Sequence, residues 1–588
     1  MKVLLVSLNA KYIHTNLAIR YLEKFCMNMD GVHVKIKEFT INEHLDGILR
    51  RIHKERADVL CFSCYIWNIE YIIKIIQMLK RVNQDYKVIL GGPEISFYGK
   101  DWMKRVPEID YIVKGEGEIT LKELLGSLMR GLKNPSSILG ILYREADQII
   151  ENPNRGLIED LDTIPFPYSG DLSQFKNKII YYESSRGCPF HCQYCLSSTI
   201  DGVRFFTLDR VKKELRYFIN AGVKQVKFVD RTFNCNRERS MELLAFLIEE
   251  GGNTNFHFEV AADLIDEEML ALFKRAPVGL FQLEIGIQST KEGTLKAIRR
   301  KNNFNRIKRV VNSIKSFKNI HQHLDLIAGL PYEGYQDFKS SFNDVYRLKP
   351  DMLQLGFLKL LKGSGIEINK DKYGYQYTPF PPYEVLSNRY MSYDDIVKLK
   401  YIEELLEKYG NSHVFDHTVD YLITRYFVEP FNFYEDFSAF WVENGLFDRS
   451  HSQKNLYRIL MGYISTLKDF SDTKGAIEIL KFDYLLTHSS PLPTFFPTVM
   501  IPNKKEKAFE FLRREENIKK YLPKYVGSPP KEIYKYVHFE RFHVNIFNKL
   551  EIGTYARNKK NITLLFDFKN HQDDLFGKNF FAEVELYD

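Results

Sequence analysis

The sequence predicts an α/β protein in three parts: a doubly wound parallel sheet, a partial barrel of parallel strands, and a mixed, mostly α-helical C-terminal domain. Two observations predict this. Strand-like and helix-like runs alternate up to about residue 130 and again from about 178 to 359, which is typical of parallel sheets covered by helices. After residue 371 helical runs dominate, and strand-like runs return only near the end.

The expected segments follow from these changes. Residues 1–135 form the sheet domain, 136–170 a hairpin and a linker, 171–370 the barrel, and 371–588 the C-terminal domain. Prolines in 152–168 bar a helix and hold the linker extended.

The first segment reads as a Rossmann-like domain. Its strand-like runs are 2–8, 32–39, 58–64, 87–90 and 109–114, and its helix-like runs are 15–29, 43–56, 68–82 and 118–130. Ligands of such sheets bind in loops at the carboxyl ends of the strands. The residues expected to bind a ligand there are Asn9, Tyr65, Trp67, Gly91, Gly92, Pro93, Gly115, Glu116 and Gly117. Glycines at strand ends let a bulky ligand approach the backbone.

A loop with three cysteines opens the barrel segment. Cys188, Cys192 and Cys195 have the spacing C-x3-C-x2-C, and a short loop can bring three thiolates onto one [4Fe–4S] cluster. Three ligands leave one iron open to a substrate or cofactor. A structural zinc site is the alternative, but it needs four closed ligands, and inert thiols are a second alternative.

The strand-like runs of the barrel segment are 179–184, 225–230, 256–260, 281–288, 323–328 and 352–359. Six strands with helices between them predict a partial, TIM-like (β/α)6 barrel. Active sites of barrels lie at the carboxyl ends of the strands, so polar residues at those ends are the candidates.

The cysteine loop resembles the signature of the radical S-adenosylmethionine (SAM) superfamily, in which an aromatic residue, here Tyr194, precedes the last cysteine. The resemblance implies that SAM binds the open iron. It also implies SAM contacts from Tyr194, Asp230, Glu259, Glu284, Gln288 and Ser289. Asp230 stands where the family often has Gly-Gly-Glu, and Glu284–Ser289 resembles the strand that contacts SAM. For Glu259 a salt bridge that stabilises the fold is the alternative.

The strand-end loops of the first segment, upstream of the cysteine loop, resemble the cobalamin-binding domain of the B12-dependent radical SAM class. The implied cofactors are a [4Fe–4S] cluster, SAM and cobalamin. The string around His44 lacks the Asp of the cobalt-ligating motif and follows the second strand. We therefore expect that His44 does not ligate cobalt, and that Asn42 caps the following helix. Residues from 371 resemble an uncharacterised domain that accompanies some of these proteins.

The resemblance implies a methyltransferase that acts on an unactivated carbon. Cyclisation or rearrangement with the same cofactors, radical modification of tRNA, and a cofactor-binding sensor are the alternatives. The expected partners are a small-molecule or peptide substrate and an electron donor such as flavodoxin or ferredoxin. The sequence assigns no catalytic residue.

Composition limits the partners and the compartment. A net charge of +7 permits nucleic-acid binding but does not indicate it. No apolar run has the length of a membrane span. Seven cysteines without a disulfide pattern are typical of a reducing cytoplasm.

Overall fold

The computed structural model describes residues 1–131, 135–468, 470–490, 492–543, 546, 561–571 and 575–586. The chain divides into two compact units. The first comprises Met1–Tyr335 and Gly356–Tyr393, and the second comprises Gln336–Leu355 and Asp394–Asp588. None of the helices formed by these described residues combines the length and the apolar character needed to cross a bilayer.

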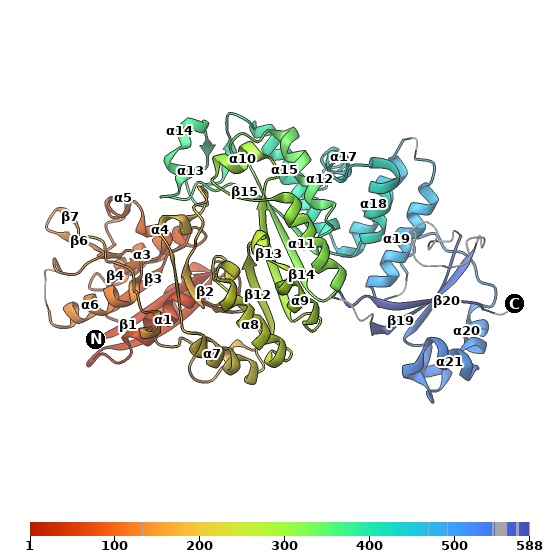
Figure 1. Cartoon of the computed structure of the whole chain (residues 1–588), viewed down its shortest axis with the longest axis horizontal. Coiled ribbons are helices and arrows are strands. Elements are labelled where there is room, and N and C mark those ends of the chain that lie inside the picture. The colour runs from red at the N-terminus through yellow and green to blue at the C-terminus, as the bar shows by residue number, and fades with distance from the viewer. Residues whose placement is uncertain are drawn as a thin grey trace. The chain divides into compact units, whose positions relative to one another are not determined.

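A seven-stranded sheet begins the first unit, with the order β2-β1-β3-β4-β5-β6-β7 (Figure 1). Its parallel strands are β1 Lys2–Asn9, β2 His33–Thr40, β3 Val59–Ser63, β4 Lys87–Gly91 and β5 Tyr111–Val113. The helices are α1 Leu17–Cys26, α2 Leu45–Lys54, α3 Ile69–Val82, α4 Pro93–Ser96, α5 Gly99–Arg105 and α6 Gly117–Met129. Leu4 and Val6 of β1 pack with α2 and α3, whereas Val3 and Leu5 pack with α1 and α6. The predicted doubly wound sheet is thereby confirmed.

The hairpin after residue 136 extends this sheet. It consists of β6 Ile141–Glu145 and β7 Gln148–Glu151, and β6 pairs antiparallel with β5. The sequence predicts the hairpin outside the sheet domain, in the segment that precedes the barrel. Its apolar residues Leu142 and Tyr143 are buried in the two cores of the sheet, and the pairing covers the edge that β5 would otherwise expose.

The barrel part contains a six-stranded sheet in the order β15-β14-β13-β12-β11-β8. The strands are β8 Ile180–Tyr182, β11 Gln225–Phe228, β12 Asn255–Val260, β13 Phe281–Gln288, β14 His321–Ala328 and β15 Met352–Phe357. The helices are α7 Leu208–Asn220, α8 Arg237–Glu250, α9 Glu267–Arg275, α10 Glu292–Ala297, α11 Phe304–Phe317 and α12 Tyr335–Tyr346. Strands β8 and β15 form the two edges, so the six-stranded partial barrel is confirmed.

Alternate residues of the barrel strands differ in polarity. Phe256 and Phe258 of β12 are fully buried in an aromatic core, where Phe258 contacts Phe228 and Phe281. The intervening positions His257 and Glu259 are polar, and strands β11, β13 and β14 also carry polar residues at alternate positions. The face opposite the aromatic core is therefore polar.

The second unit is mostly helical. Its helices are α15 Tyr393–Leu405, α16 Asp416–Leu422, α17 Pro430–Glu443, α18 Gln453–Thr466, α19 Thr473–Thr487, α20 Lys504–Arg513, α21 Glu515–Tyr521 and α22 Pro530–Ile533. An antiparallel sheet is formed by β18 Val537–Phe542, β19 Ile562–His571 and β20 Asn579–Val584. His413 pairs with Asp416 at 3.2 Å and His417 with Asp483 at 2.7 Å, so these two histidines bind different carboxylates.

Helix α12 follows a barrel strand in sequence, yet residues 336–346 belong to the second unit. Its aromatic face explains this: the Phe342 ring lies 5.4 Å from that of Phe431, and Tyr346 lies 5.8 Å from Tyr434. Aromatic pairs at such distances contribute beyond the area that they bury.

The return segment, residues 358–387, closes the first unit. It contains α13 Gly365–Ile368, α14 Lys370–Tyr373, β16 Gln376–Tyr377 and β17 Val385–Ser387. Lys362 binds Glu94 at 3.1 Å, and the hydroxyl of Tyr383 donates to the same carboxylate oxygen at 2.6 Å. The amide of Ile366 donates to the carbonyl of Gln193 at 2.8 Å. The segment thus contacts both the α4 region and the cysteine loop.

A two-stranded ribbon of β9 Ser185–Gly187 and β10 Val203–Phe205 closes the cysteine loop. At Gly187 φ is +102°, and an added Cβ would lie 2.2 Å from the carbonyl oxygen of Gly202. Only glycine fits there without moving the backbone.

We therefore expect Gly187→Ala to destabilise the protein more than Gly202→Ala. Gly202 has a φ of +79° but open space around its Cβ position, so its substitution should cost about 1–2 kcal/mol from the left-handed conformation alone. Urea-unfolding midpoints of the full-length variants measure the difference. Equal midpoints would contradict the close backbone contact.

Candidate cofactor site

The cysteine loop lies between β9 and the short helix Leu196–Thr199. All three of its thiols are free, Cys188 and Cys192 are buried, and Cys195 is partly exposed. Cys188 Sγ lies 3.6 Å from the Thr232 hydroxyl, and the amide of Ser197 donates to Cys195 Sγ at 3.4 Å. A tight turn, in which the Cys195 amide donates to the Cys192 carbonyl at 3.1 Å, brings two of the cysteines together.

Neighbouring segments hold the middle of the loop. The amide of Gln193 donates to the Ile298 carbonyl at 2.9 Å, and Arg300 Nη1 donates to the Tyr194 hydroxyl at 3.0 Å and contacts Cys192 Sγ at 3.7 Å. Burial raises the pKa of the Cys192 thiol, and the Arg300 charge opposes that rise. His191 is exposed, with Nδ1 3.9 Å from Asp201, so it is a poor fourth zinc ligand. The donor set of three thiols therefore fits a cluster with one open iron better than tetrahedral zinc.

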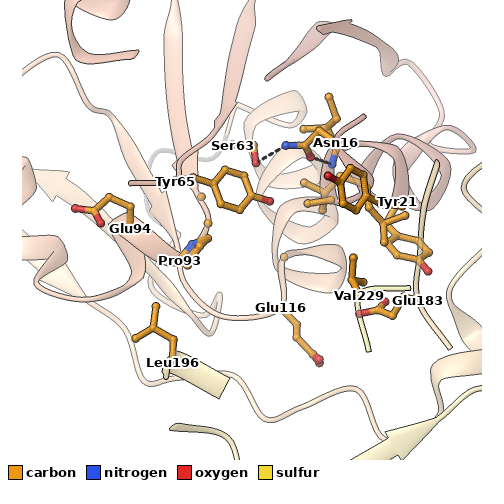
Figure 2. A pocket seen from close by; sticks show the side chains of 18 of the residues that line it. Asn16, Tyr21, Ser63, Tyr65, Pro93, Glu94, Glu116, Glu183, Leu196 and Val229 are labelled. Atoms are coloured by element: carbon orange, nitrogen blue, oxygen red, sulfur yellow. Dashed lines mark hydrogen bonds between the residues drawn. The ribbon is translucent and has the colours of Figure 1, made fainter. Parts of the chain in front are cut away.

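A cavity of about 850 Å³ lies between the N-terminal sheet and the barrel strands of the first unit (Figure 2). Every strand-end residue that the sequence proposed for cobalamin lines it: Asn9, Tyr65, Trp67, Gly91, Gly92, Pro93, Gly115, Glu116 and Gly117. Cys195 and Leu196 of the cysteine loop line the same cavity, as does Glu259 of β12. The structure thus brings the loops of both parts to one space.

The cavity continues as an apolar slot beneath the strand ends. Sheet residues Leu5, Cys61, Ile89 and Val113 and helix residues Ile19, Leu22 and Leu121 line it. Figure 2 shows the ring of Tyr65 projecting into the cavity, with its hydroxyl toward Asn16 and Tyr21 and with Leu196, Glu183 and Val229 across from it. The ring stacks on Trp67 with 4.3 Å between the centroids.

Two of the strand-end residues have a structural role. Asn9 is buried, accepts from the Ser7 hydroxyl at 2.8 Å and donates to the His14 carbonyl at 3.0 Å, which fixes the loop after β1. A Cβ at Gly92, where φ is +113°, would lie 2.5 Å from the Cys64 carbonyl oxygen. The loops after β3 and β4 can approach so closely only because Gly92 has no side chain.

Two arginines of the ribbon bind the glycine loop 115–117 and its neighbour. Arg204 Nη2 donates to Glu116 at 2.7 Å, and Arg186 Nη2 donates to Glu118 at 2.6 Å. Burial alone would raise the pKa of Glu116, but its bonds with Arg204 and Ile158 and the Arg186 charge hold that pKa below its usual value. Sequence reasoning missed both arginines. Their signal was opposite charge: they flank the cysteine loop, and Glu116 and Glu118 flank Gly117.

The residues that the sequence proposed for SAM differ in their exposure to the cavity and in their hydrogen-bond partners. Glu259 lines the cavity, and burial raises its pKa to about 7, although the nearby Arg231 opposes the rise. Asp230 is 2% exposed, and its carboxylate accepts bonds from the Ser184 amide at 2.7 Å and from the hydroxyls of Ser184 at 2.5 Å and Ser185 at 2.8 Å. The observed role of Asp230 is therefore to hold the turn before the cysteine loop.

Glu284, Gln288 and Ser289 lie along β13 and its end. Glu284 binds Lys227 at 2.9 Å and lies 3.0 Å from His257 Nε2; burial would raise its pKa, but these two partners lower it to about 2. Gln288 follows a bulge in β13, has a φ of +69°, and its buried Oε1 finds no hydrogen bond among the described residues. Such a strained residue with an unused acceptor is typical of a binding site.

His14 is a further cavity residue that sequence reasoning missed. It lies in the loop after β1, and its Nδ1 is 2.7 Å from the Tyr181 hydroxyl. His44, by contrast, is exposed at the N-terminus of α2, where it occupies the capping position expected for Asn42 without making a side-chain cap bond. The position of His14, directly after the first strand, was the available signal.

Comparison with known proteins divides the chain in the same order. Residues 3–125 match the B12 binding domain, 182–345 match the radical SAM superfamily, and 371–566 match a protein family of unknown function, DUF4080. An uncharacterized methyltransferase of Pyrococcus horikoshii is 29% identical over 47% of this chain and 61% of its own length. The cobalamin-dependent radical SAM methyltransferase TokK of Streptomyces tokunonensis is 25% identical over 52% of this chain and 46% of its own length.

The chain thus matches about half the length of these curated relatives. Among solved structures, the cobalamin-dependent S-adenosylmethionine radical enzyme OxsB, with aqua-cobalamin and S-adenosylmethionine bound, aligns with a TM-score of 0.57 at 15% identity, over 82% of this chain and 78% of its own. At that identity the likeness supports the fold alone. The chain therefore combines a B12-binding domain, a radical SAM domain and a DUF4080 domain in that order, as expected from its resemblance to the B12-dependent radical SAM class.

Proposed function

We propose that the protein is a B12-dependent radical SAM enzyme that methylates an unactivated carbon of a small-molecule or peptide substrate. One observation carries the proposal: the strand-end loops of the B12-type sheet and Cys195 of the cysteine loop line one cavity. When bound, SAM at a [4Fe–4S] cluster supplies a hydrogen-abstracting radical, and cobalamin supplies a methyl group. A carbon without a lone pair needs both, and they must lie close together.

Different residues of the chain would bind the cluster, cobalamin and SAM. Cys188, Cys192 and Cys195 would hold the cluster. The glycine loops would admit the corrin close to the backbone. The apolar slot beneath the strand ends would take the aromatic base of its nucleotide tail, because an apolar ring gains by leaving water. The proposed SAM contacts are Tyr194, Glu259, Glu284, Gln288, Ser289 and the buried Asp230.

The barrel wall of the cavity is charged, which supports a polar substrate. Lys227, Arg231 and Glu259 all line it, and Arg231 is exposed there. A low-potential one-electron donor such as flavodoxin or ferredoxin would reduce the cluster, because the loop's exposed Pro189 and His191 leave one edge open. All seven cysteines are free, which supports a cytoplasmic enzyme.

Replacing Cys188, Cys192 and Cys195 together by Ala should abolish the visible iron–sulfur absorbance of the anaerobically reconstituted protein, because no thiolate of the loop remains to bind iron. Iron and sulfide analysis measures the loss. Cys235→Ala is the matched control, since this neighbouring thiol is outside the motif and should be dispensable. Retention of four irons per chain in the triple variant would sink the assignment.

We also expect His44→Ala to leave the spectrum of bound cobalt(II) cobalamin unchanged, because His44 is exposed outside the cavity lining. Electron paramagnetic resonance reports a nitrogen ligand as hyperfine splitting. Splitting that disappears in His44→Ala contradicts the prediction. Splitting that survives there and disappears in His14→Ala would instead assign the ligand to His14, which lines the cavity.

Cobalamin should lie between the sheet and the barrel, with its upper face toward SAM at the cysteine loop. The reason is that both sets of loops open into the same cavity. A structure with both cofactors bound tests this, and magnetic coupling between the reduced cluster and cobalt(II) tests it in solution. Cobalt on the outer surface of the N-terminal sheet, with no coupling to the cluster, would exclude direct methyl capture in that state.

A further inference from the structure

Arg300 reaches the cysteine loop from a separate element. It follows α10, in a turn where its amide donates to the Leu295 carbonyl at 2.9 Å. Its guanidinium group points back to the loop: Nη1 lies 3.7 Å from Cys192 Sγ and 3.0 Å from the Tyr194 hydroxyl, and Nη2 donates to the Gly286 carbonyl. The side chain therefore links β13, which ends at Gln288, to the cysteine loop.

No salt bridge joins this guanidinium group to a carboxylate among the described residues, and its Nε makes no hydrogen bond there. The Asp263 carboxylate interacts with its charge only without direct contact. Its bonded neighbours are a thiol, a phenol and a backbone carbonyl. The two arginines of the ribbon differ, because Arg186 binds Glu118 and Arg204 binds Glu116. A largely buried charge without a salt bridge is costly, so the position of Arg300, which is only partly exposed, favours an anion at the cysteines.

We propose that Arg300 is the counter-ion of a [4Fe–4S] cluster held by Cys188, Cys192 and Cys195, and that it raises the reduction potential of that cluster. The inference rests on the proposed function. Reduction takes one electron from an external donor and takes the cluster core from the 2+ to the 1+ state, which adds one negative charge. A fixed positive charge beside Cys192 stabilises the reduced state more than the oxidised one. A hydrogen bond to a ligand sulfur acts in the same direction.

Arg300 is in this view a positioning and tuning residue, since it contacts a cluster ligand and not the substrate. Burial strengthens its effect, because the field of a charge is screened less away from water. The neighbouring Arg299 provides an internal comparison. It is exposed, and no bond from its side chain to the cysteine loop is present among the described contacts.

The test is a redox titration of the full-length, anaerobically reconstituted protein without substrate, with the reduced cluster followed by electron paramagnetic resonance. Arg300→Gln removes the charge, Arg300→Lys keeps it, and Arg299→Gln removes the same charge one residue away. We expect the midpoint potential to become more negative in Arg300→Gln, to change less in Arg300→Lys, and to stay at the wild-type value in Arg299→Gln. Equal potentials in wild type and Arg300→Gln would overturn the proposal.

A second measurement needs no variant that removes the positive charge. In wild-type protein labelled with ¹⁵N-arginine, the reduced cluster should show a ¹⁵N hyperfine coupling that is absent from labelled Arg300→Lys. Absence of that coupling from wild type would also overturn the assignment. The two hypotheses remain distinguishable: wild-type protein that binds no iron contradicts the proposed function, whereas a reducible cluster that is insensitive to Arg300 contradicts only this inference.

Discussion

The contact between the cysteine loop and the N-terminal sheet depends on a pair of buried ion pairs. Arg186 and Arg204 lie directly opposite each other in the ribbon of β9 and β10, and they bind Glu118 and Glu116. None of these four side chains is more than 13% exposed. Arg186 also lies 3.4 Å from Glu116 and 3.0 Å from Glu183, so the ion pairs form one network. Removing a charge from it leaves the remaining buried charges less well compensated. These ion pairs thus set the distance between the cysteine loop and the glycine loop 115–117.

This arrangement suits the proposed methyl transfer, which has two reactive centres. A carbon radical must meet its methyl donor before it is quenched, so the distance between the centres has to be constant. Salt bridges on a two-stranded ribbon provide a stiffer connection than the linker 152–168 could, because the ribbon begins and ends the loop that carries the sulfurs. Arg300 also lies at that loop, and it contacts Cys192 Sγ where Arg186 and Arg204 bind carboxylates.

Much of the site could be predicted from sequence because it is local. The cysteine spacing lies within eight consecutive residues, and strand-end loops converge wherever strands run parallel, so Tyr65, Gly92 and Glu116 could be brought together without coordinates. Contacts between distant segments could not be predicted. Arg300 is 108 positions from Cys192, and the bonds of Asp230 to Ser184 and Ser185 depend on how β8 and β11 meet. The positions of the hairpin and of α12 also differ from those expected. The hairpin pairs with the open edge at β5, and the aromatic face of α12 packs on aromatic residues of the second unit.

The return segment has a consequence for dividing this protein into parts. The DUF4080 match begins at residue 371, yet Tyr383 binds Glu94, directly after the Gly-Gly-Pro loop of the cavity. The compact unit that contains the cavity extends to Tyr393. A chimera in which a foreign domain replaces the chain from residue 371 onward would therefore lose Tyr383, which binds Glu94 at the cavity. A junction placed after residue 393 would keep Glu94 and its partner Tyr383 in the same native unit, so the boundary suited to a chimera lies downstream of the start of the family match.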